Sequence, residues 1–182
     1  MRSDRKQAIL DAALEVFASE GYHVASISKI AKAAGVSKGL MYNYFESKQD
    51  LLNVLLDKIN DGMMKILELP ESQVIDDVFF EGFIRATFAL LGNDNKLWRL
   101  YYMLFMQPEV MRIEESKILP LLPPFLGAMR TFFEEKGFED PDASMTFFFS
   151  QMDGLKLSCV FNSAAFDSEK MIAMLLKQYI QS

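Results

Sequence analysis

Few residues in this sequence of 182 amino acids are suited to catalysis. The chain holds one cysteine, Cys159, so no disulfide can form within it, and one histidine, His23. We find no Ser-His-Asp set, no cluster with metal-ligand spacing and no glycine-rich phosphate loop. We therefore predict that the chain is not an enzyme and has no catalytic residue, cofactor or metal site.

Membrane and export signals are also missing. The N-terminal segment MRSDRKQAIL lacks the apolar core of a secretory leader. No run reaches the roughly 18 uncharged apolar residues of a membrane helix. The closest run, ILPLLPPFLGAM, is broken by three prolines. We expect a cytoplasmic protein without a membrane partner.

The negative charge of the chain is unevenly spread. The net charge is -6, which argues against nonspecific coating of nucleic acid. Residues 1–60 hold 8 Lys/Arg against 7 Asp/Glu, whereas residues 61–182 hold 11 against 18. Only the N-terminal part can approach a polyanion without a large electrostatic cost.

The apolar residues recur at helical spacing, and no run alternates as a strand does, so we predict an all-α fold. N-terminal helices are predicted over about 3–20, 27–34, 38–45 and 47–67. Beyond Pro70, further helices are predicted over about 72–92, 95–107, 117–136, 141–163 and 168–180. This organisation gives an N-terminal three-helix domain over residues 1–47 and a C-terminal helical domain over residues 48–182, connected by helix 48–67.

The N-terminal helices have the pattern of a helix-turn-helix. Ser26 and Ser37 are suitable N-caps, Gly35 supplies a tight turn between their helices, and Ser47 with Asp50 forms a capping-box pattern. A helix, a short turn with glycine and a second short helix are typical of DNA-binding proteins.

The segment AGVSKGLMYNYFESK, residues 34–48, is unusually aromatic for a solvated helix. Met41 and Phe45 are four residues apart and are predicted to face the core. The remaining side chains would face solvent or a partner: Lys38, Gly39, Leu40, Tyr42, Asn43 and Tyr44. This set suits a DNA major groove, because tyrosine can bind phosphate and asparagine can pair with adenine. The alternative is a helical hairpin whose aromatic residues pack on the second domain.

The segment SISKIAKAAGVSKGLMYNYFESKQDLL, together with Phe17 and Gly21, resembles the DNA-binding segment of the TetR (tetracycline-repressor) family of bacterial regulators. The resemblance covers about residues 5–60. It implies phosphate contacts at Ser26, Tyr42 and Lys48, where Lys48 would act with the free N–H groups of its helix. It also implies that Lys38, Leu40, Asn43 and Tyr44 lie in or beside the major groove of the DNA. The full predicted DNA-binding set is Ser26, Ser37, Lys38, Gly39, Leu40, Tyr42, Asn43, Tyr44 and Lys48. Leu40 departs from the small polar residue usual there.

The resemblance further implies a dimer and a ligand pocket in the C-terminal domain. The predicted dimer interface lies on the last two helices and comprises Phe148, Leu155, Cys159, Met171, Leu175 and Tyr179. The predicted effector pocket comprises Phe79, Phe83, Trp98, Tyr101, Tyr102, Phe105 and Met152. Such soft and aromatic side chains favour a lipophilic or aromatic effector, although each of them can equally belong to the core.

Two functions are consistent with these observations. The first is a ligand-responsive transcriptional regulator, a repressor by our interpretation, that binds a palindromic operator as a homodimer and leaves it when a small effector binds. The second is a helical protein-interaction adaptor without DNA binding. Activation is the alternative to repression, because the sequence encodes DNA binding and not the position of the binding site at a promoter.

Overall fold

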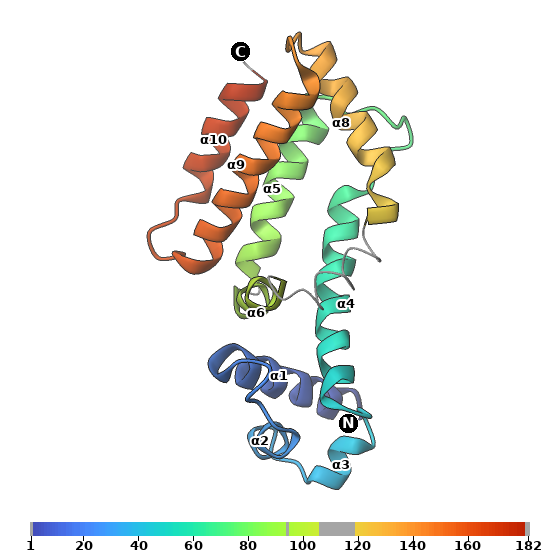
Figure 1. The fold of residues 1–182 in the computed structure, drawn as a ribbon, viewed down its shortest axis with the longest axis vertical. Helices are drawn as coiled ribbons and strands as arrows, with labels where there is room; N and C mark the ends of the chain where they lie inside the picture. The colour runs from blue at the N-terminus through green and yellow to red at the C-terminus, as the bar shows by residue number, and fades with distance from the viewer. Residues whose placement is uncertain (1, 94, 106–118, 181–182) are drawn as a thin grey trace. The chain divides into compact units, whose positions relative to one another are not determined.

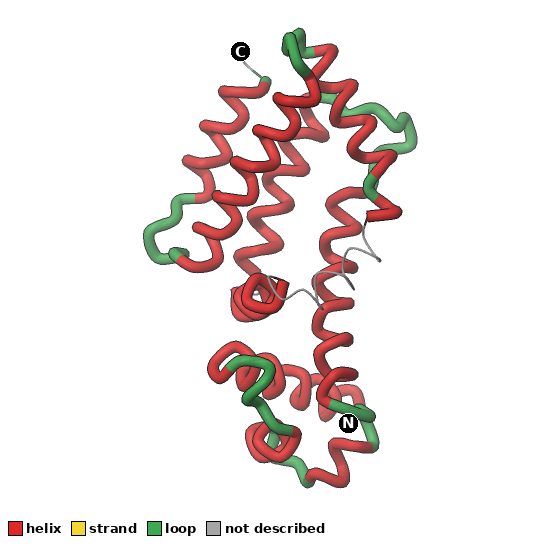
Figure 2. The backbone as a smooth tube through the Cα atoms, in the orientation of Figure 1, coloured by secondary structure: helices red, strands yellow, loops and turns green. Residues whose placement is uncertain are grey.

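The computed structural model describes residues 2–93, 95–105 and 119–180. These residues form helices and connecting turns, and no strand occurs among them (Figures 1 and 2). The all-α prediction is confirmed. The described residues belong to two compact units. The first contains residues 2–61 and 95–105, and the second contains residues 62–93 and 119–180.

The first unit is built on a three-helix core. Its elements are α1 (Arg2–Glu20), α2 (Ile27–Ala33), α3 (Lys38–Tyr42), the first part of α4 (Lys48–Leu67) and α6 (Asn95–Phe105). Helix α1 packs against α2 and α6, and α2 packs against α3. The helices bury large apolar side chains together, among them Ile9, Phe17, Ile30, Met41, Phe45 and Leu51. Burial of this kind stabilises short helices that would not persist alone.

Two glycines make the turns of this unit possible. Gly21 ends α1 with a φ of 84°, and Gly35 turns the chain between α2 and α3 with a φ of 65°. L-residues with a side chain rarely adopt such φ values. These sharp turns allow α2 to pack against α1 and α3 to pack against α2.

The second unit has an aromatic core. Its elements are the last part of α4, α5 (Asp77–Asn93), the short 3₁₀ helix η1 (Leu119–Leu121), α8 (Pro123–Glu135), α9 (Pro141–Phe161) and α10 (Ser168–Tyr179). Helix α9 packs against α5 and α8, and Figure 1 shows α9 beside α5. Helix α10 also packs against α5. Phe80 stacks on Phe132 with ring centroids 4.6 Å apart, and Phe148 meets the Tyr179 ring edge-on at 5.1 Å.

Two helices begin later than the sequence predicts. Helix α5 starts at Asp77 because Asp76 caps it, its carboxylate accepting a hydrogen bond from Phe79 N at 2.8 Å. Helix α8 starts at Pro123, since proline is favoured in the first turn of a helix and not in its interior. The residues predicted to be helical at 106–107 and 117–118 lie outside the described part of the chain.

Candidate DNA-binding surface

Helix α3 has one buried face and one exposed face. The Ser37 hydroxyl accepts a hydrogen bond from Leu40 N at 3.1 Å and so caps the helix. Met41 has no exposed surface, and Phe45, which follows the helix, is 2% exposed. The prediction that these two residues face the core is confirmed, and their burial fixes the rotation of α3.

The opposite face of α3 is exposed to solvent. Lys38, Gly39 and Asn43 are exposed, Tyr42 is 48% exposed, and Leu40 and Tyr44 are half-buried. A cation, an amide and a phenol side by side can donate to phosphates and read base edges.

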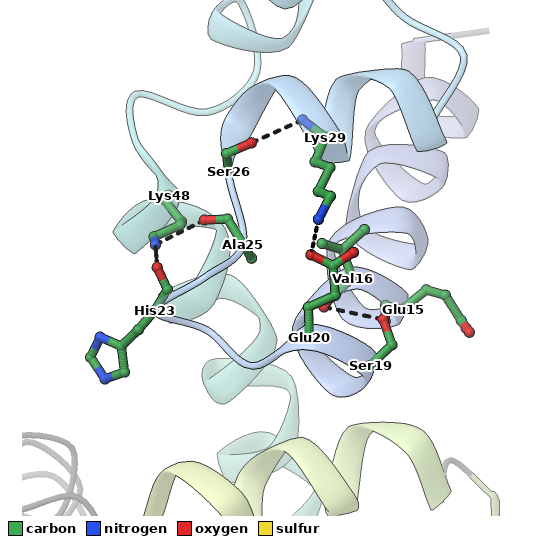
Figure 3. Close-up of polar contacts among 9 residues, drawn as sticks. All are labelled: Glu15, Val16, Ser19, Glu20, His23, Ala25, Ser26, Lys29 and Lys48. Carbon is green, nitrogen blue, oxygen red and sulfur yellow. Dashed lines mark hydrogen bonds and ion pairs between the residues drawn. The ribbon is translucent and has the colours of Figure 1, made fainter.

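Ser26 marks the start of α2. Its hydroxyl oxygen accepts a hydrogen bond from Lys29 N at 3.3 Å, and the side chain remains exposed (Figure 3). An accepting hydroxyl keeps its own hydrogen, so Ser26 can donate to an anion while it caps the helix. Lys29 also pairs with Glu20 at the end of α1, which ties α2 to α1.

The charged group of Lys48, although predicted to contact a phosphate, contacts the protein itself. The Nζ atom donates hydrogen bonds to the carbonyl oxygens of Tyr22 at 2.8 Å, Ala25 at 3.0 Å and His23 at 3.3 Å. Figure 3 shows the side chain reaching from the start of α4 to the turn between α1 and α2. Sequence analysis missed these contacts.

The start of α4 is capped by two side-chain hydrogen bonds. Ser47 Oγ accepts a hydrogen bond from Asp50 N at 3.0 Å, and Asp50 Oδ2 accepts one from Glu46 N at 3.0 Å. The predicted Ser47 cap is confirmed, but the Asp50 carboxylate accepts from the residue before the cap and not from Ser47 N as in a standard capping box. This arrangement places a carboxylate where an isolated helix start would attract an anion.

Most residues predicted at the dimer interface lie in the core of the second unit. Phe148, Cys159, Leu175 and Tyr179 are each at most 8% exposed, and Leu155 and Met171 are half-buried. Four other large apolar residues of α9 and α10 are strongly exposed: Phe147 at 56%, Leu157 at 43%, Phe161 at 45% and Met174 at 61%.

The residues predicted to line the effector pocket belong to both compact units. In the second unit, Phe83 and Met152 are buried and Phe79 is half-buried. In the first unit, Trp98 and Tyr101 are buried and Tyr102 is half-buried. The Phe105 side chain lies outside the described part of the chain. A single pocket shared by these residues stays a prediction.

Neither a metal-ligand cluster nor a helix able to span a membrane occurs within residues 2–93, 95–105 and 119–180.

The N-terminal unit is similar to a family of known proteins. Residues 9–55 match the model for bacterial regulatory proteins of the tetR family. The fatty acid metabolism regulator protein of Bacillus subtilis is 37% identical over 93 residues, which are 49% of this chain and 46% of that protein. The transcriptional activator FasR of Mycolicibacterium smegmatis is 31% identical over 102 residues, 56% of this chain and 47% of the relative.

These alignments span about half the length of the curated relatives. One solved structure, the fatty acid degradation regulator FadR from Bacillus halodurans, matches more broadly. It is 26% identical, the match covers 96% of this chain and 94% of that one, and the TM-score is 0.67. All three relatives are named as regulators, consistent with the expectation that the chain is not an enzyme. The helix-turn-helix with the exposed α3 face thus lies within the segment that is similar to the tetR family of bacterial regulatory proteins, and the fold of the whole chain is similar to that of a bacterial regulator.

Proposed function

We propose that the chain is a cytoplasmic transcriptional regulator that binds a palindromic DNA operator as a homodimer and is released by a lipophilic effector. The observation that carries the proposal is the exposed face of α3, held in place by the burial of Met41 and Phe45. A short helix with a fixed buried face and an exposed polar and aromatic face suits insertion into the major groove.

Each exposed residue has a role that its chemistry supports. Lys38 supplies charge near the phosphates, and the Tyr42 hydroxyl donates to a phosphate oxygen. Asn43 has the amide geometry that pairs with adenine N6 and N7, and Gly39 leaves room for the DNA backbone. Ser26 adds a phosphate contact from α2.

A homodimer follows from the size of this surface. One five-residue recognition helix offers few base contacts, whereas two copies about 34–36 Å apart read two half-sites. Helix α9 carries a stripe that suits the partner copy, because Phe147, Gly154, Leu157 and Phe161 recur at helical spacing and are exposed. A Cβ added at Gly154 would meet nothing within 4 Å, so this part of the face is open to a neighbouring helix.

The effector is proposed as a lipophilic molecule because the second unit is dense in aromatic side chains. Phe83 lies 5.2 Å from Phe125 between ring centroids, and Met152 adds an adaptable thioether. Two relatives have fatty acid metabolism or degradation in their names, which directs the search toward acyl compounds. A ligand that binds only the folded chain raises its melting temperature, so thermal-shift screening of acyl compounds tests this part.

Repression is the proposed direction of control, with ligand favouring a dimer that no longer fits the operator. The test of the whole proposal is selection of genomic fragments by the purified protein, beside a Tyr42→Ala variant. A Lys65→Ala variant is the control, since Lys65 is exposed on the α4 segment of the second unit. We expect the wild type and the control to enrich one palindrome, and Tyr42→Ala to lose it. Equal enrichment by all three proteins would contradict the assignment.

A further inference from the structure

We propose that Lys48 is a positioning residue and not a phosphate ligand: its ammonium holds the turn between α1 and α2 against the start of α4. These bonds fix the position of α2, and of Ser26 at its start, on the DNA-binding surface. The expected effect on DNA binding rests on the proposed function. The hydrogen bonds of Lys48 do not, because they are present in the protein without DNA.

The first argument is the number of hydrogen bonds. A lysine ammonium has three hydrogens and no acceptor. In the structure three backbone carbonyl oxygens, those of Tyr22, His23 and Ala25, lie 2.8–3.3 Å from Lys48 Nζ. All three donors are therefore used inside the protein, and a phosphate contact would have to break at least one of these bonds.

The second argument is the surroundings of the ammonium. Lys48 is half-buried, and its Nζ lies 4.5 Å from the centroid of the Tyr22 ring, where a cation is attracted to the ring face. Two further contacts fix that ring: its hydroxyl donates to Gln49 Oε1 at 2.8 Å, and it forms a T-shaped pair with Phe17, with ring centroids 5.3 Å apart. The contacts join α1, the turn and α4 in one cluster.

The third argument is the charge at the start of α4. The Asp50 carboxylate lies in the first turn of α4 and accepts a hydrogen bond from Glu46 N, so a negative charge already complements the dipole of this helix. This leaves less attraction for a DNA phosphate at the same place.

The turn held by Lys48 leads directly into α2. Ala25 is 3% exposed, its carbonyl accepts from Lys48, and the next residue is the cap Ser26. Because Ala25 is packed and bonded on both sides, a shift of this carbonyl moves Ser26 with it. Losing the Lys48 bonds therefore misplaces a DNA contact without removing one.

The discriminating variant is Lys48→Arg, which keeps the charge. An arginine can replace lysine at a phosphate, but a planar guanidinium cannot direct three hydrogens from one point to three converging carbonyls. Lys48→Met is a second variant, and Lys38→Met is the matched control because Lys38 is exposed on α3. Circular dichroism establishes that each variant is folded at the assay temperature.

Two measurements are made on the full chain. The first is hydrogen exchange of the peptide covering residues 22–30 without DNA. The second is affinity for the palindrome selected by the wild type, and for a scrambled duplex, at several salt concentrations. We expect faster exchange in both Lys48 variants and unchanged exchange in Lys38→Met. Lys48→Arg should bind the palindrome at least about tenfold more weakly, as expected from loss of charged hydrogen bonds.

The salt dependence separates positioning from phosphate binding. Lys48→Met should keep the wild-type slope of log affinity against log salt, because no phosphate contact is lost, whereas Lys38→Met should lower the slope by about 0.9. Lys48→Arg should lose discrimination against the scrambled duplex. Wild-type affinity of Lys48→Arg, or unchanged exchange in both Lys48 variants, would overturn the proposal. If the wild type binds no DNA, the proposed function fails, and exchange alone then decides whether Lys48 holds the turn.

Discussion

The Asp50 amide donates a hydrogen bond of 3.0 Å to the Ser47 hydroxyl, and the Asp50 carboxylate accepts one from Glu46 N. These two bonds cap the start of the helix that follows the DNA-binding segment. They predict that Ser47→Ala lowers the free energy of unfolding by about 1 kcal/mol, because one amide loses its cap. Urea unfolding measures the loss. Ser150→Ala is the control, since Ser150 bonds only within its own helix and should change stability little. Equal losses in both variants would contradict the role of the cap.

Backbone conformation gives a second prediction. Gly35 has a φ of 65°, so Gly35→Ala should destabilise the first unit by about 1 kcal/mol. Gly127 lies within α8 and a Cβ there would meet nothing within 4 Å. Gly127→Ala should therefore stabilise the protein by about 0.5–1 kcal/mol, through the helix propensity of alanine. Thermal melts of the two variants should shift in opposite directions, and shifts of the same sign would refute the backbone argument.

Burial of Tyr179 predicts a loss of stability at high pH. Burial raises the pKa of Tyr179 from 10.0 to about 12, and its hydroxyl donates to Gln151 Oε1. The unfolded chain therefore loses this proton first. The stabilisation is complete below pH 10 and disappears between pH 10 and about 12, by an amount on the order of 2 kcal/mol.

The control for this prediction is Tyr179→Phe. It should be less stable than the wild type at neutral pH, because Gln151 loses a donor, and its stability should fall less between pH 10 and 12. Burial raises the pKa of Tyr22 as well, so a smaller decline should persist in the variant. Parallel pH profiles for the two proteins would show that Tyr179 does not titrate in this way.

The proposed homodimer predicts that a charge on the exposed stripe of α9 separates the subunits. Leu157→Glu should convert the dimer to a monomer in sedimentation experiments, because an unpaired charge would be buried at the interface. Val78→Glu is the control, since Val78 is 79% exposed on α5. A Leu157→Glu variant that stays dimeric would move the interface elsewhere.

Local signals predicted much of the fold. The serine caps at residues 26, 37 and 47 and the inward direction of Met41 and Phe45 each follow from spacing over three or four residues, and the structure has them all. Such features depend only on neighbours in the chain, so one sequence suffices to find them.

The features that were missed depend on distant residues or on ambiguous patterns. Lys48 bonds carbonyls 23 to 26 residues earlier, and no periodicity marks such a contact. In α9, the sequence TFFFSQMDGLKLSCVF is apolar on two faces. Phe147 and Phe148 begin two equally regular stripes, and only packing shows that the stripe from Phe148 is inside.

The central claim is that the exposed face of α3 binds DNA. Its most direct test is the affinity of the purified chain for its selected palindrome as salt is varied, compared with Lys38→Ala and Lys65→Ala. We predict that log affinity falls linearly with log salt, with a slope about 0.9 shallower for Lys38→Ala and unchanged for Lys65→Ala. Absence of binding at low salt, or identical slopes for all three proteins, would contradict the account.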